Sequence, residues 1–386
     1  MDYKIASEKL HRKLQGKIST ELKAEINSKE DLAIVYSPGV AEPCNLIHAD
    51  KSKAYDYTLK GNTIAVISDG SAVLGLGNIG PEAALPVMEG KCALFKKFAG
   101  LNAFPIVLDT QDTEEIIKTV KHLAPTFGGI NLEDISAPRC FEIEERLKAE
   151  LDIPVFHDDQ HGTAIVVLAG LINSLKITGK KKEDIKVIIN GVGAAGVAIT
   201  KLLLLYGVKD IVVVDSAGVI HKGRSNLNPT KEMLTNVTNT ACLLDPSSSE
   251  CITGGLEEAV KGRDIFIGVS APGVLTENMI RSMNTDPIIY GLANPIPEIM
   301  PELAYSAGAK IVATGRSDYP NQINNVLVFP GIFRGALDSR VSKITDEMKL
   351  QAAEALADLV ENPSPEKIIP EAFDEGVMEA IARSIK

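Results

Sequence analysis

Short apolar runs alternate with helical periodicities along the first 150 residues. The predicted strands lie in segments 62–80, 103–109 and 128–136, and the predicted helices in 7–26, 82–100, 113–127 and 140–151. The first strand runs into a glycine-rich turn, and the third ends in acidic residues. We expect segment 82–100 to form two helices, because Pro86 and Gly90 interrupt it. The alternation of strands and helices indicates an α/β layer architecture.

A second alternating series begins near residue 162. It starts with an apolar helix at 162–179 and continues through a strand, turn, helix and strand at 184–218; further strands are expected at 264–270, 287–295 and 310–315, and a helix at 343–361. The prediction is an α/β protein of two domains. An N-terminal α/β catalytic domain spans about residues 1–160, and a Rossmann-type domain with a doubly wound parallel sheet spans 161–386. The end of the chain is expected to pack back on the first domain.

A glycine-rich turn joins strand and helix within segment 184–218. Gly191, Gly193 and Gly196 have the G-x-G-x-x-G spacing, with Ala194 and Ala195 between the last two. These glycines allow a tight turn, a close approach of a pyrophosphate, and close packing of helix against strand. Asp215 ends the next strand, where a carboxylate can accept hydrogen bonds from the adenosine ribose. This context predicts dinucleotide binding, with a structural glycine turn as the alternative.

The choice between NAD and NADP depends on charge near Asp215. Its carboxylate would repel a 2′-phosphate and therefore favours NAD. Lys222 and Arg224 follow within a few residues and are able to reach such a phosphate. We expect NAD to be preferred over NADP.

Acidic residues follow two of the predicted strands. Glu133 and Asp134 end one strand, and Asp158 and Asp159 follow the apolar residues just before 157. Oxygen ligands without cysteine suggest Mg²⁺ or Mn²⁺. Adjacent carboxylates repel one another, so a cation between them would explain their placement.

Two other interpretations of this acidic region stay open. His157 and His161 have the i, i+4 spacing of a zinc-binding helix, although an apolar strand precedes them and Gly162 follows. Alternatively, Asp158 or Asp159 caps a helix that begins near Gly162.

Tyr36 and Lys91 also stand out as candidates for proton transfer. Tyr36 opens a loop rich in proline and glycine at 36–43, and Lys91 lies among apolar residues. Desolvation or a neighbouring cation would lower the pKa of Lys91 enough for it to act as a base. The alternatives are a core tyrosine and a surface lysine.

The composition excludes several classes of function. A net charge of −11 over 386 residues argues against general nucleic-acid binding. We find no apolar run long enough to span a membrane and no secretory signal, and we therefore expect a cytoplasmic protein. The five cysteines form no C-x-x-C pair and are expected to be reduced thiols.

Several longer motifs resemble those of malic enzymes and occur in the same order. They are YSPGVAEPC, SDGSAVLGLGNIGPEAALPVMEGK, NLEDI, FHDDQHGTA, NGVGAAG, GLANPIPE and NNVLVFPG. The resemblance runs from about residue 15 to 380 and is to the short, single-module prokaryotic type. It implies oxidative decarboxylation of (S)-malate to pyruvate and CO₂, with NAD(P)⁺ and Mg²⁺ or Mn²⁺. It also implies a homodimer or a higher homo-oligomer.

The resemblance assigns a role to each motif residue. It implies that Glu133, Asp134 and Asp159 are metal ligands and that Asp158 beside them is a catalytic residue. It implies that Lys91 is the general base and Tyr36 the general acid. It also implies that Asn294 and Asn325 contact the substrate and that Asn294 lies near the cofactor. One position departs from the family, because long eukaryotic members carry a carboxylate-binding arginine where this chain has Ala72. Ser37, the backbone around Gly75 to Gly80 and the asparagines are the expected substitutes for it.

Two rival functions are consistent with the same residues. One is a metal-dependent dehydrogenase of another 2-hydroxy acid that releases no CO₂. The other is a regulatory protein that senses a dinucleotide and has no active site.

Overall fold

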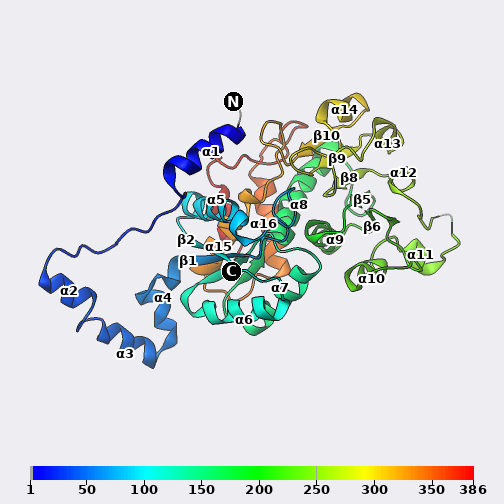
Figure 1. Cartoon of the computed structure of the whole chain (residues 1–386). Helices are drawn as coiled ribbons and strands as arrows, with labels where there is room; N and C mark the ends of the chain where they lie inside the picture. Colours follow the sequence, from blue (N-terminus) through cyan, green and yellow to red (C-terminus); the bar gives the residue numbers. More distant parts are fainter. Residues whose placement is uncertain (1–2, 249) are drawn as a thin grey trace.

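The computed structural model describes residues 3–248 and 250–386 and contains two parallel sheets with helices around them (Figure 1). The first sheet has the order β2-β1-β3-β4 and is entirely parallel. Its strands are β1 (Thr63–Ser68), β2 (Asn102–Val107), β3 (Gly129–Leu132) and β4 (Val155–His157). All residues of β1, β3 and β4 are buried, as expected for parallel strands covered on both faces. The carboxyl ends of β3 and β4 therefore lie side by side.

The second sheet has the order β10-β9-β8-β5-β6-β7. Its strands are β5 (Lys186–Asn190), β6 (Asp210–Asp215), β7 (Gly218–Val219), β8 (Ile265–Gly268), β9 (Ile288–Gly291) and β10 (Ile311–Thr314). Five strands are parallel, and only the short β7 pairs antiparallel, with β6. The strand numbers rise from β5 toward both edges of the sheet, so the order of the chain reverses direction there. In doubly wound sheets a ligand binds at such a reversal, beyond the carboxyl ends of the strands.

Five long helices lie between strands: α5 (Pro81–Ala99), α6 (Thr113–Leu123), α7 (Arg139–Glu150), α8 (Asp158–Thr178) and α9 (Ala194–Tyr206). Two more, α15 (Phe329–Asp338) and α16 (Asp346–Asp358), follow the last strand, β10. Shorter helices are α10 (Pro229–Thr235), α11 (Ala241–Leu244), α12 (Leu256–Ala259), α13 (Glu277–Arg281), α14 (Pro301–Ser306) and α17 (Val377–Arg383).

Helix α5 is continuous, so the prediction of two helices was wrong. Pro86 lies inside the helix, where it removes one backbone hydrogen bond. One buried stripe nevertheless runs through Ala84, Met88, Cys92 and Phe95. Burial of this stripe offsets the cost of the proline and keeps the helix in one piece.

Segment 7–26 is also shorter as a helix than predicted, because α1 (Tyr3–Leu14) ends at Leu14. Gln15 and Gly16 both have positive φ, which stops the helix there. Beyond it, α2 (Lys29–Val35), α3 (Ala41–Ala49) and α4 (Ala54–Tyr57) form an arm, which we define as residues 27–58. Helices α2 and α3 stand away from the rest of the chain (Figure 1), and α2, α3 and α4 contain no buried residue.

Helix α8 begins at Asp158, four residues before the predicted start. It is long and apolar enough to cross a membrane by length and composition alone, but 72% of its most apolar window is buried inside the molecule. Its burial identifies it as a central core helix. Both aspartates lie in its first turn, where the helix dipole favours negative charge.

One hydrophobic cluster includes residues from both sheets, such as Ile64 of β1 and Val187 of β5. Helix α15 contributes two aromatic rings to it. The ring centroids of Phe329 and Phe333 lie 4.7 and 5.4 Å from that of Phe95 on α5. The C-terminal part of the chain thus packs against α5, the helix that connects β1 and β2 of the first sheet.

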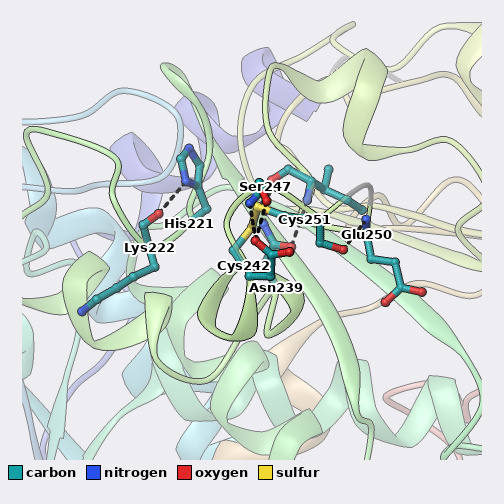
Figure 2. Close-up of a disulfide and its surroundings, with 10 residues drawn as sticks. His221, Lys222, Asn239, Cys242, Ser247, Glu250 and Cys251 are labelled. Atoms are coloured by element: carbon teal, nitrogen blue, oxygen red, sulfur yellow. Dashed lines mark hydrogen bonds between the residues drawn. A yellow bond between two sulfur atoms is a disulfide. The ribbon is translucent and has the colours of Figure 1, made fainter.

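The expectation that all cysteines are reduced thiols was wrong for two of them. Cys242 and Cys251 form a disulfide across nine residues, whereas Cys44, Cys92 and Cys140 are free (Figure 2). The loop folds back on itself because the Asn239 side chain donates to the Ile252 carbonyl at 2.7 Å and accepts from the Ile252 N–H at 3.2 Å. This return brings two cysteines together that have no recognisable spacing in the sequence.

Candidate active site

Lys91 lies at the centre of a buried group of charges. Its Nζ is 2.5 Å from Asp158 Oδ2 and 2.8 Å from Glu133 Oε1. Nζ also lies 4.1 Å from the centre of the Phe329 ring. Four elements thus meet here: the middle of α5, the end of β3, the first turn of α8 and the start of α15.

Three carboxylates beside Lys91 form a group suited to a cation. Glu133, Asp134 and Asp159 offer ligand atoms that all lie within 4.8 Å of one another. Asp134 adopts a left-handed backbone with φ of 53°, and its N–H donates to Asp159 Oδ2 at 2.9 Å. Asp134 Oδ2 is buried without a hydrogen-bond partner among the described residues. These residues fit a hard divalent cation such as Mg²⁺ or Mn²⁺, which binds carboxylate oxygens.

The pKa values of these acids reflect their crowding. Burial, together with the neighbouring carboxylates, raises the pKa of Asp134 to about 9. Burial also raises the pKa of Asp158 to about 8, although Lys91 opposes the change. Protons and a cation therefore compete for the same oxygens.

The expectation that the pKa of Lys91 is lowered was wrong for the metal-free chain. Burial alone would lower this pKa, but the carboxylates of Asp158 and Glu133 outweigh burial and raise it above its ordinary value. No sequence pattern showed that both acids touch the same ammonium.

The histidines next to the acids have a different role from the zinc alternative. His161 Nε2 lies 2.8 Å from Glu144 Oε2, and Glu144 Oε1 also accepts from the His157 N–H at 2.9 Å. Burial would raise the pKa of Glu144, but His161 and Lys148 lower it well below its usual range. Among the described residues, the metal-competent group contains acids only. Glu144, which the sequence did not single out, fixes the junction of β4 and α8.

The helix-capping alternative was also wrong in detail. His157 is the N-cap residue of α8 and makes no side-chain capping bond. Asp158 and Asp159 follow it, and their side chains point to Lys91 and to the Asp134 N–H. Their contacts belong to the charge group.

A cavity of about 760 Å³ extends from this group to the second sheet. Its lining includes Lys91, Glu133, Asp134, Asp159, Asn294, Asn325, Ala72, Ala195 and Ser270. The loop after β1 approaches the loop after β9 closely, since a Cβ on Gly75 would lie 2.7 Å from the Asn294 carbonyl oxygen. The cavity therefore joins the charge group to both asparagines and to the first turn of α9.

Tyr36 and Ser37 lie on the arm and do not line this cavity. Tyr36 is 70% exposed, and Ser37 is exposed as well. The structure of one chain thus brings Lys91, the acids and the asparagines together but leaves these two residues outside.

The glycine-rich turn lies between β5 and α9 as predicted. Gly191 has φ of 122°, and a Cβ there would lie 2.5 Å from the Val269 carbonyl oxygen. A Cβ on Gly196 would lie 1.9 Å from the Gly191 carbonyl oxygen. Gly193 is the N-cap of α9, and Ala194 and Ala195 form its first turn. Only glycine fits at 191 and 196, as a dinucleotide turn requires.

A second cavity of about 810 Å³ beside this turn contains Asp215. Arg224 Nη2 donates to both carboxylate oxygens of Asp215, at 2.7 and 2.9 Å, and Lys231 Nζ donates at 2.6 Å. Burial would raise the pKa of Asp215, but these hydrogen bonds lower it. Lys222 instead bonds to Asn236 at 3.4 Å. Sequence analysis missed Lys231, because nothing in the pattern links it to a strand end 16 residues earlier.

Two family models match the chain. The model described as the malic enzyme N-terminal domain matches residues 15–148, and the malic enzyme NAD binding domain matches residues 160–376.

Individual relatives agree over nearly the whole chain. A "Bifunctional malic/malolactic enzyme" of Bacillus subtilis is 58% identical, with 97% of this chain and 90% of that protein covered. A "NAD-dependent malic enzyme" of Geobacillus stearothermophilus is 57% identical, with 96% and 76% covered. The crystal structure of a Thermotoga maritima NAD-dependent malic enzyme has a TM-score of 0.93 at 52% identity and covers 98% of both chains. The fold, the glycine turn, the acid group and these matches together show that the chain belongs to the malic enzyme family.

Proposed function

We propose that this protein catalyses the oxidative decarboxylation of (S)-malate to pyruvate and CO₂ with NAD⁺ or NADP⁺. The observation that carries the proposal is the buried Lys91, paired with Asp158 beside three convergent acids, in a cavity that reaches the dinucleotide turn. This arrangement supports a base, a cation site and a dinucleotide site that would surround one substrate.

Lys91 is the proposed base that would take the proton of the C2 hydroxyl, and a nicotinamide bound at the dinucleotide turn would accept the hydride from C2. The acids raise the pKa of Lys91 in the metal-free chain, so this role requires the bound cation to offset their charge. Asp158 keeps the amine oriented through its 2.5 Å hydrogen bond. Glu133, Asp134 and Asp159 would hold the divalent cation, which supplies Lewis acidity at the C2 oxygen when bound.

The two asparagines are the proposed contacts to substrate and cofactor. Both line the cavity that contains Lys91, and both carry amides able to donate to a carboxylate or a nicotinamide carbonyl. Asn294 follows β9 and Asn325 opens η4 (Asn325–Leu327), so the second sheet positions them.

Tyr36 is the proposed acid that protonates C3 of the enol of pyruvate after CO₂ leaves. Its exposure on the arm requires a way to reach a cavity. Leu32, Ile34 and Val35 on the same arm are exposed as well, and a group of exposed apolar side chains marks an interaction surface. We propose a homodimer in which the arm of one copy packs on the other and delivers Tyr36 to the partner's cavity.

The proposal is tested by measuring malate turnover with Mn²⁺ and either NAD⁺ or NADP⁺. We expect equal amounts of reduced cofactor, CO₂ and pyruvate, and no turnover after removal of the cation by a chelator. Reduced cofactor without CO₂ would instead indicate a simple 2-hydroxy acid dehydrogenase. Lactate without net cofactor reduction would indicate a malolactic reaction, which the name of the Bacillus subtilis relative makes a necessary control.

A further inference from the structure

The N-terminal segment closes one end of the substrate cavity. Ser7 and His11 of α1, and Lys17 just beyond it, line the same cavity as Lys91 and the three acids. His11 Nδ1 lies 2.8 Å from the Ser7 carbonyl oxygen, whereas His11 Nε2 is buried without a hydrogen-bond partner among the described residues. This end of the cavity therefore has polar groups that the chain itself does not satisfy.

Lys17 is held over α5, the helix that carries Lys91. Its Nζ donates to the Pro86 carbonyl at 2.5 Å, and its N–H donates to Glu89 Oε2 at 2.9 Å. A Cβ on Gly90 would lie 3.3 Å from the Lys17 Nζ, so the absence of a side chain there leaves room for the ammonium. Lys17 is thus fixed at both its backbone and its side chain.

The charge of Lys17 is only partly offset by another residue. Burial lowers the pKa of Lys17, and the nearby Glu89 carboxylate opposes that change. Lys91 is paired with two carboxylates, whereas no ion pair within 4.0 Å to Lys17 occurs within the part of the chain that the structure describes. A cation that lines a cavity without a carboxylate in direct contact is available to an anionic ligand.

The end of the cavity that contains Lys91 and the acids has an excess of negative charge, which a further cation such as Lys17 would offset. When ionised, the carboxylates of Glu133, Asp134, Asp158 and Asp159 exceed the combined charge of Lys91 and one divalent cation by one negative charge. Malate adds two more. At the position of the family's carboxylate-binding arginine the cavity has Ala72, which offers no charge.

We propose that Lys17 binds the carboxylate of malate that is remote from the hydroxyl and thereby makes the pocket selective for a dicarboxylate. The inference rests on the proposed function, because it takes malate as the substrate. The C2 hydroxyl of malate and the carboxylate next to it form a chelating pair, which suits a cation held by the three acids. With that pair at the acids, the remote carboxylate turns toward Lys17.

The partial exposure of Lys17 fits this role. A solvated ion pair orients the carboxylate without holding it so strongly that loss of CO₂ becomes difficult. Contacts that are equal in the ground state and the transition state change KM more than kcat. Lys17 should therefore act mainly on substrate affinity.

The experiment compares Lys17→Met with the wild type, using (S)-malate as substrate and oxalate as inhibitor. We expect KM for malate to rise about tenfold or more with kcat changed less than threefold, since a neutral side chain of similar length loses only the charge. Oxalate lacks a remote carboxylate, so its inhibition constant should stay within about twofold. Lys17→Arg should restore most of the malate affinity. Lys13→Met is the matched control, because Lys13 is exposed on the same segment and does not line the cavity.

Calorimetric titration of malate into each Mn²⁺-loaded variant provides a readout that is independent of turnover. Weaker malate binding in Lys17→Met, with unchanged oxalate binding, supports the proposal. A malate affinity within twofold of wild type overturns it, and so does an equal loss of malate and oxalate affinity, which would show a general structural role. If the wild type binds malate but produces no pyruvate, the proposed function fails while the titration still decides the role of Lys17.

Discussion

Lys91 and Asp158 depend on each other at the level of single residues. Both side chains are almost completely buried, and Lys91 also pairs with the buried Glu133. Removing one partner of a buried ion pair leaves a charge without compensation, so removing Lys91 leaves both carboxylates unpaired, whereas removing Lys91 and the Asp158 charge together leaves only Glu133. Their interaction can therefore be separated into a stability effect and a catalytic effect.

We predict that Lys91→Met abolishes measurable turnover and lowers the free energy of unfolding by about 3–5 kcal/mol. Adding Asp158→Asn to Lys91→Met should recover part of the stability, because one of the two carboxylates that lost Lys91 is then neutral while Glu133 keeps its charge, but none of the activity. Urea unfolding of the metal-free proteins measures the first effect, and steady-state kinetics measures the second. A double variant that is as unstable as Lys91→Met would contradict the pairing.

The raised pKa of Asp134 makes the stability of the metal-free protein depend on pH. In the metal-free folded protein Asp134 keeps its proton up to about pH 9, whereas in the unfolded chain it ionises at its ordinary, much lower pKa. The folded state therefore binds more protons between these values, and its stability falls as the pH rises. A cation replaces these protons and removes the repulsion.

We therefore predict that Mn²⁺ raises the midpoint of thermal unfolding more at pH 8 than at pH 6. Asp134→Asn should reduce the difference between the two pH values. An equal shift at both pH values in the wild type would contradict the assignment of Asp134 as a ligand.

At the scale of elements, the period of the apolar residues predicted most strands of both sheets and most of the long helices, but not the short β7 or α15. It failed where long-range packing decides the outcome. Pro86 predicts a break in α5, but the buried stripe on either side of it is continuous. The ends of strands were informative, since Glu133, Asp134 and Asp215 were identified there. Partners from distant segments, such as Lys231 and Lys17, were missed because a single lysine has no periodic context.

We predict that Asp215 at the end of β6, Arg224, and Lys231 in α10 together determine cofactor choice. Asp215 engages both Arg224 and Lys231, so neither cation is free for a 2′-phosphate. We predict that the wild type prefers NAD⁺. Asp215→Ser should release both cations and raise kcat/KM for NADP⁺ relative to NAD⁺ by about tenfold or more.

The matched control for this change is Lys222→Ala, since Lys222 bonds to Asn236 instead of Asp215. Its ratio of kcat/KM values should equal that of the wild type. A wild type that already favours NADP⁺ would show that Arg224 and Lys231 outweigh the carboxylate.

For the whole molecule, the proposed dimer would make the arm of one copy part of the active site of the other. The sequence indicated Tyr36 as an acid through a motif, but it gave no sign that the residue lies on an exposed segment far from the cavity lining. The local sequence pattern does not show where an exposed segment such as the arm packs. If Tyr36 acts in the partner's cavity, each active site needs residues from two chains.

Mixing two inactive variants tests this arrangement. We predict that Lys91→Met and Tyr36→Phe each lose most activity, and that exchanging subunits between them restores up to about a quarter of wild-type activity. Half of the random dimers are mixed, and one of the two sites in each mixed dimer has both residues intact. No recovery, despite subunit exchange confirmed by mass spectrometry, would place Tyr36 in its own chain's cavity.

The hydrophobic cluster shared by the two sheets has a consequence for how the chain loses its structure on heating. Ile64 and Val187 belong to one cluster, and α15 inserts Phe329 and Phe333 next to Phe95. Neither half can melt without exposing the aromatic face of the other. In scanning calorimetry the metal-free chain should thus give one endotherm, with a van't Hoff enthalpy close to the calorimetric value, and a fragment ending near residue 160 should not fold alone.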